Sequence, residues 1–144
     1  MAKLPRNQSL LSHLVALPIL IVPFALYNIL AFLFNLKFIE QVFHIPRLLL
    51  ADSLPVSTGD ILVFLGVLLL YVEIVRATRR SGGLMDQGLS LLLFIAMLVE
   101  FITVQRAGTS TFLNLLALSL VDVIGGFTIS VRAAQRDVML ETHH

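Results

Sequence analysis

The sequence contains no cysteine and no tryptophan among its 144 residues, and only 13% of them are charged. Without cysteine, the chain cannot form disulfides, thiolate metal sites, cysteine nucleophiles or dithiol redox centres. Without tryptophan, an aromatic belt at a membrane surface would depend on phenylalanine, Tyr27 and Tyr71. Soluble domains carry about a quarter charged residues, so these charges are too few to cover a surface in water.

What the chain has in abundance is apolar side chains. Hydrophobic residues make up 58% of the sequence, and the mean hydropathy is +0.94. This composition predicts an integral membrane protein that has the lipid bilayer as its surroundings. The net charge is only +1, which gives no indication of nucleic-acid binding, and we expect no nucleic-acid partner.

Four apolar stretches are long enough to cross a bilayer, which takes roughly 20 residues in a helix. They cover about 9–36, 59–77, 87–106 and 111–133. The sequence therefore predicts an all-α integral membrane protein in which four transmembrane helices form a compact bundle. We expect one membrane domain over 1–144 with a cytoplasmic tail from 134 to 144. Pro18 and Pro23 lie inside the first stretch and predict a kink there.

The first loop, about 37–50, has its own pattern. Polar residues recur at helical spacing, with apolar residues between them, at Lys37, Glu40, Gln41, His44 and Arg47. This pattern predicts a short amphipathic helix lying in the membrane interface. A second local pattern, Ser-Thr-Gly-Asp at 57–60, predicts the start of the next helix because these residues favour N-terminal caps.

Lysine and arginine are unevenly divided between the two sides of the predicted bundle. Seven fall on the side of the termini and three on the other, namely Lys3, Arg6, Arg76, Arg79, Arg80, Arg132 and Arg136 against Lys37, Arg47 and Arg106. The positive-inside rule then places both termini in the cytoplasm. We expect a multi-pass protein of the cell membrane, of the bacterial inner-membrane type, anchored by the basic cluster Arg76, Arg79 and Arg80.

Three acids lie within the predicted spans, Glu73, Glu100 and Asp122, and each is embedded in a stripe of small residues. Small residues mark helix contacts in membranes, and acids in spans face a bundle interior or a wet cavity. We therefore expect all three acids to point inward. The helix-packing positions predicted with them are Gly66, Ser119, Gly125, Gly126 and Ser130.

The acids have different candidate roles. Glu73 is expected to pair with Arg76 one turn on, and Glu100 to bind water near the outer surface. Asp122 lies near the bilayer centre, where an aspartate costs about 2.5–3.5 kcal/mol. It could be neutral and donate a hydrogen bond to Asn28, exchange protons or cations in transport, or pair with a basic residue of a partner.

Three classes of function remain open. The absence of catalytic motifs favours a non-enzymatic accessory, assembly or scaffold subunit of a larger membrane complex, bound to a membrane-protein partner or to further copies of itself. The alternative is a small oligomeric proton- or cation-coupled transporter or channel that uses Asp122 or Glu100. A lipid or quinone enzyme would need convergent groups, whereas His13, Asn28 and Glu73 lie at different depths. His13 and His44 fall on opposite sides, so we expect no metal site and no cofactor.

Overall fold

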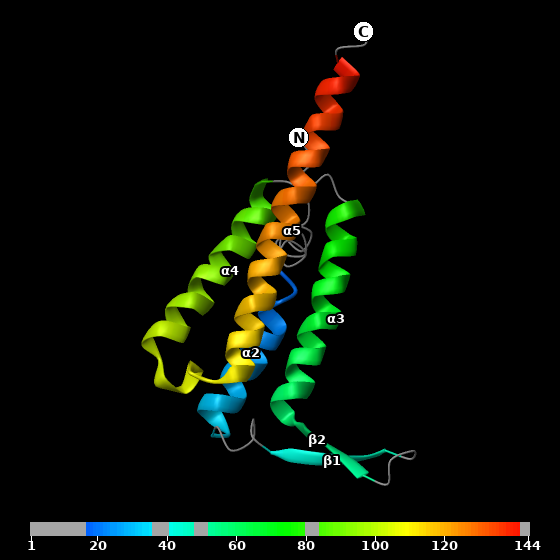
Figure 1. Cartoon of the computed structure of the whole chain (residues 1–144). Coiled ribbons are helices and arrows are strands. Elements are labelled where there is room, and N and C mark those ends of the chain that lie inside the picture. The colour runs from blue at the N-terminus through cyan, green and yellow to red at the C-terminus, as the bar shows by residue number, and fades with distance from the viewer. Residues whose placement is uncertain (1–16, 36–40, 48–51, 80–83, 142–144) are drawn as a thin grey trace, which may run out of the picture.

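The computed structural model describes residues 17–35, 41–47, 52–79 and 84–141, and it is mostly helical (Figure 1). The elements, in chain order, are α2 (Ile21–Asn28), the π-helical turn η1 (Ile29–Leu33), β1 (Val42–Arg47), β2 (Asp52–Ser57), α3 (Thr58–Arg79), α4 (Leu84–Thr103), the 3-10 turn η3 (Gln105–Ala107) and α5 (Ser110–Glu141). The predicted helical bundle is thus accompanied by a small two-stranded sheet.

Helix α5 is the central element of the bundle. It packs between α3 and α4, and α2 lies against both α3 and α5 (Figure 1). With 32 residues, α5 is about 48 Å long at 1.5 Å per residue, and its C-terminal part extends beyond the other helices. The helix therefore continues through 134–141, where a tail was predicted.

The two long helices begin at side chains that cap them. The Ser57 hydroxyl accepts a hydrogen bond from the backbone N–H of Asp60 at 3.0 Å, and the Asp60 carboxylate accepts one from the Ser57 N–H at 2.8 Å. This reciprocal pair is a capping box. At α5, the Thr109 hydroxyl accepts from the Phe112 N–H at 3.2 Å. Local chemistry thus fixes where α3 and α5 start.

The helix predicted over 37–50 is wrong for residues 42–47, which form strand β1. Strand β1 pairs antiparallel with β2, with Val42 opposite Ser57 and Arg47 opposite Asp52. The physical reason lies in two prolines, because a residue that precedes proline is pushed out of the helical region. Ile45 and Leu54 are both in that position, and β-branched and aromatic neighbours favour strands. Residues 37–40 and 48–50 of this prediction lie outside the described residues.

The described part of the first predicted span begins with a turn and not with helix. Pro18 lies in a turn, where its carbonyl accepts from the Ile21 N–H at 3.1 Å, and α2 starts only at Ile21. Pro23 falls in the first turn of α2, where a helix needs no backbone donor. Within the described residues, Pro18 therefore lies in a turn and α2 follows it without a break at Pro23. The stretch from Ile21 to Leu33 is about 20 Å long, and residues 9–16 lie outside the described part of the chain.

Two helices in the described residues have the length and apolar character needed to cross a membrane. They are α3, over Thr58–Arg79, and the part of α5 from Ser110 to Gln135. The apolar segments Ile21–Leu33 and Gln87–Thr103 are shorter. The bundle core lies where α2, α4 and α5 meet, and it includes the buried side chains of Tyr27, Met97 and Phe112.

Candidate functional site

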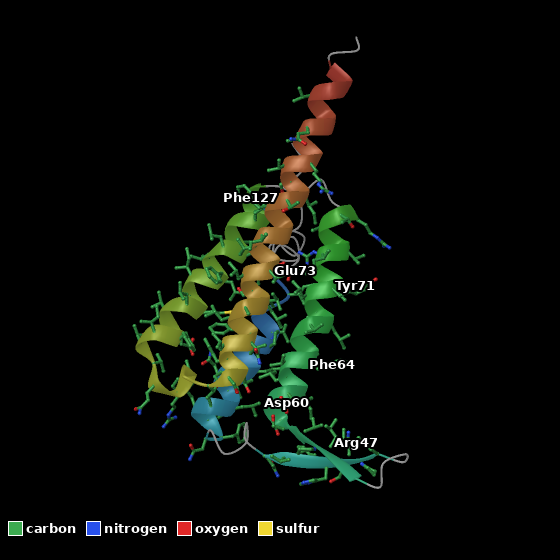
Figure 2. All side chains as sticks on the ribbon, in the orientation of Figure 1. Arg47, Asp60, Phe64, Tyr71, Glu73 and Phe127 are labelled. Carbon is green, nitrogen blue, oxygen red and sulfur yellow. The ribbon has the colours of Figure 1, made fainter. Side chains whose placement is uncertain are left out.

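Glu73 of α3 binds the start of α2. Its carboxylate accepts hydrogen bonds from the Ile19 N–H at 3.0 and 3.1 Å and from the Leu20 N–H at 3.4 Å. Figure 2 shows Glu73 on the side of α3 that faces the other helices, whereas Tyr71 points away from them. The negative charge therefore lies at the positive end of α2, where a helix favours an anion.

The local sequence explains why this end of α2 needs an acceptor from another helix. The backbone N–H groups at a helix start have no partner in the helix itself. The residues that precede α2 are Pro18, Ile19 and Leu20, and none of them has a side chain that can accept a hydrogen bond. Glu73 supplies the missing acceptor, so that a single carboxylate ties α2 to α3.

Asp122 of α5 is buried near this contact. Its carboxylate lies within hydrogen-bonding reach of the Ser90 hydroxyl of α4, and both residues are at least nine-tenths buried. Asp122 and Arg76 both lie in the neighbourhood of Glu73. Ser119, one turn before Asp122, is also buried. Three helices thus contribute polar groups to one region of the interior, namely Glu73 from α3, Ser90 from α4 and Asp122 from α5.

Glu100 of α4 belongs to a second group at the other end of α2. The Asn28 amide donates to one Glu100 carboxylate oxygen at 3.3 Å and to the Phe24 carbonyl at 3.3 Å. Asn28 was one predicted partner of Asp122, but it binds Glu100. The second oxygen, Oε1, is buried and has no hydrogen-bond partner among the described residues.

Tyr27 lies beside this second group and is fully buried. Its hydroxyl donates to the Arg106 carbonyl at 2.8 Å and is 2.7 Å from the Thr109 hydroxyl. A role for Tyr27 in an aromatic belt is therefore wrong, because its ring packs inside the bundle. The Arg106 guanidinium reaches the Ala31 carbonyl at 3.4 Å and lies 5.4 Å from the centre of the Phe32 ring. These contacts join the end of α2 to the connection between α4 and α5.

The glycines predicted for packing have different surroundings. Gly66 is buried, and a Cβ atom there would lie 3.0 Å from Leu118 and 3.1 Å from Leu115, so the glycine allows α3 to approach α5 closely. A Cβ at Gly126 would lie 2.9 Å from the flexible end of Gln87, whereas one at Gly125 would meet nothing within 4 Å. Of the two adjacent glycines, Gly126 is therefore the one in contact with α4.

The remaining predicted residues lie toward the opposite end of the bundle from the sheet. Ser130 of α5 and Arg76 of α3 are partly exposed, and Arg79 is exposed. Arg80 lies outside the described residues. Within residues 17–35, 41–47, 52–79 and 84–141, no group of three or more His, Asp and Glu residues is placed to hold a metal ion.

Two contacts went unrecognised in the sequence, although it contains a signal for each. Tyr27 places a hydroxyl in the middle of an apolar stretch, and a buried tyrosine usually needs a hydrogen-bond partner. The start of α2 offers free N–H groups with no local acceptor, so an acid from elsewhere was to be expected.

The sequence matches no protein-family model and no curated protein, and the structure matches no solved structure.

Proposed function

We propose that the chain is a small integral membrane protein whose helices form a four-span bundle in a cell membrane, with both termini in the cytoplasm. The exposure of its apolar helices supports this. In the most apolar 18-residue stretch of α3, only 17% is buried, and in the corresponding stretch of α5 only 28% is buried. A core helix of a soluble protein buries most of such a window, whereas a helix in lipid has an apolar outer surface.

In that membrane, we propose that the protein is a non-enzymatic accessory, assembly or scaffold subunit of a larger complex. The carrying observation is that Glu73 is bound by the backbone of α2 within the same chain. Glu100 is likewise bound by Asn28, and Asp122 is buried within the bundle. The interior acids thus hold the bundle together, and what the protein offers outward is an apolar surface that a partner can contact.

Photo-cross-linking in the membrane tests this role. A benzophenone amino acid replaces Phe64 or Tyr71, which are 64% and 67% exposed on α3, and a buried control replaces Leu70. We expect the exposed positions to give an adduct with a distinct membrane protein, or with a second copy of the chain, and Leu70 to give none. Adducts with lipid alone at both exposed positions would contradict the accessory role.

A second candidate, proton- or cation-coupled transport, is favoured by one observation. Glu73 of α3 and the buried Asp122 of α5 lie on two helices that pack against each other. Pairs of interior acids are typical of proton relays in transporters.

For this candidate we expect Asp122→Asn to abolish cation-linked proton flux in liposomes. Glu100→Gln is the matched control and should keep the flux, because Glu100 binds at the opposite end of α2. Unchanged flux in Asp122→Asn, or no flux in the wild type, removes this candidate and leaves the accessory role in place.

A further inference from the structure

The β-hairpin formed by β1 and β2 has one apolar face. Residues that lie opposite each other in an antiparallel pair share a face, and successive residues alternate between faces. The pairs that begin with Phe43 and Ile45 therefore place four apolar side chains together, and Arg47, paired with Asp52, continues the same face at the end of the strands away from α3. We call this set the apolar face of the hairpin: Phe43, Ile45, Leu54 and Val56. Three of them are about half exposed, with Phe43 at 48%, Ile45 at 51% and Leu54 at 46%.

The other face of the hairpin differs in chemistry. There His44 lies opposite Pro55, Pro46 opposite Ser53, and Val42 opposite Ser57. Polar side chains and prolines dominate this face. The hairpin is therefore amphipathic over its two central pairs, while Val42, which is 49% exposed, is an apolar residue of the other face.

The edges of the hairpin are poor in hydrogen-bond donors. The Thr58 N–H donates to the Gln41 carbonyl at 3.0 Å, so that 41 and 58 form a hydrogen-bonded pair. By alternation, the N–H groups of 42, 44, 46, 53, 55 and 57 point outward. Pro46 and Pro55 have no N–H, and the N–H of Ser57 is bound by Asp60.

This arrangement disfavours an added strand from another protein, because prolines at an edge interrupt the row of donors that strand pairing needs. It also suits a place where water is scarce. An open strand edge cannot lie in the hydrocarbon interior, but at the interface water and lipid headgroups satisfy the few groups that remain.

The hairpin is also continuous with the apolar surface of the bundle. Strand β2 ends at Ser57 and α3 begins at Thr58, and Ile61 and Phe64 are exposed on the first turns of α3. Figure 1 shows the hairpin running across the axis of α3 at the end of the bundle, as a segment lying along a membrane surface would. An interfacial segment keeps its apolar side toward the acyl chains and its polar side toward water.

We propose that the hairpin lies in the lipid interface and inserts its apolar face among the acyl chains, anchoring one end of the bundle. This inference rests on the proposed membrane location of the protein. It names the lipid of one leaflet, and not a protein, as the partner of this surface.

Fluorescence quenching in liposomes tests the proposal. The chain has no tryptophan, so each variant carries a single fluorophore. Phe43→Trp and Leu54→Trp report the apolar face, and His44→Trp is the matched control on the other face of the same strand. Leu92→Trp on α4, at a position that is 62% exposed, is the reference for a position in lipid. We expect lipids brominated on the acyl chain to quench positions 43 and 54 about twofold more than position 44, because neighbouring positions face opposite sides.

Each other outcome has a distinct meaning. Equal quenching at 43 and 44 overturns the proposed insertion of one face. A blue-shifted but unquenched emission at 43 and 54 also overturns it, because the face is then covered by protein. If position 92 is quenched while 43 and 54 are not, the hairpin proposal fails and the membrane location stands. If position 92 is not quenched either, the membrane location itself fails.

Discussion

Replacing Glu73 by alanine is expected to lower the free energy of unfolding in detergent by about 2–4 kcal/mol, since a buried polar group left without a partner costs about 1–3 kcal/mol. The change leaves two such groups without an acceptor, the N–H of Ile19 and the N–H of Leu20. The substitution also removes the anion at the positive end of α2. Denaturant or thermal unfolding followed by circular dichroism measures the loss.

Two further variants separate this contact from a general effect of mutating α3. Glu73→Gln keeps one acceptor oxygen and should lose roughly half as much stability. Thr78→Ala removes an exposed hydroxyl of the same helix that bonds only to the Val75 carbonyl, and it should be neutral. Amide exchange gives a local readout, with Ile19 and Leu20 exchanging faster in Glu73→Ala than in the wild type. An alanine variant as stable as Thr78→Ala would show that Glu73 does not hold α2.

The start of α3 could be predicted because it depends on neighbouring residues. Ser-Thr-Gly-Asp at 57–60 indicated a cap, and the structure has the capping box of Ser57 and Asp60 at that place. The prediction of a helix in the first loop was wrong because the structure there depends on residues that are distant in the sequence. Helical spacing of its polar residues is a weak local signal, and the pairing of Phe43 with Val56 is a contact that periodicity does not encode. The prolines at 46 and 55 were the local signal against a helix, because the residue before a proline disfavours helical backbone angles.

For the acids, the sequence predicted the inward orientation but not the hydrogen-bond partners. The small-residue stripes predicted that Glu73 and Asp122 face the interior, because that follows from helical spacing alone. Their partners depend on where α2 begins, which sets the height of Ile19 and Asn28 beside α3 and α4. Asn28 therefore meets Glu100, and backbone N–H groups, whose acceptor cannot be identified from the sequence, meet Glu73.

The second large effect is expected at Phe112, whose ring joins three helices. It is fully buried on α5, and its centre is 4.9 Å from the Tyr27 ring and 6.1 Å from the Phe24 ring of α2. It also stacks on Phe101 of α4 at 6.2 Å. In lipid, helices are held together by packing contacts of this kind and not by exclusion of water. Removing the ring leaves a cavity at the point where α2, α4 and α5 meet.

We therefore expect Phe112→Ala to cost about 3–5 kcal/mol, the usual loss for a buried phenylalanine. Phe127→Ala is the matched control, since this phenylalanine lies on the same helix but is 60% exposed, and it should change stability by less than about 0.5 kcal/mol. Phe112→Leu fills part of the cavity and should fall between the two. This order follows from the different burial of the two rings along α5. If Phe127→Ala were the more damaging change, the described packing of Phe112 against α2 and α4 would be wrong.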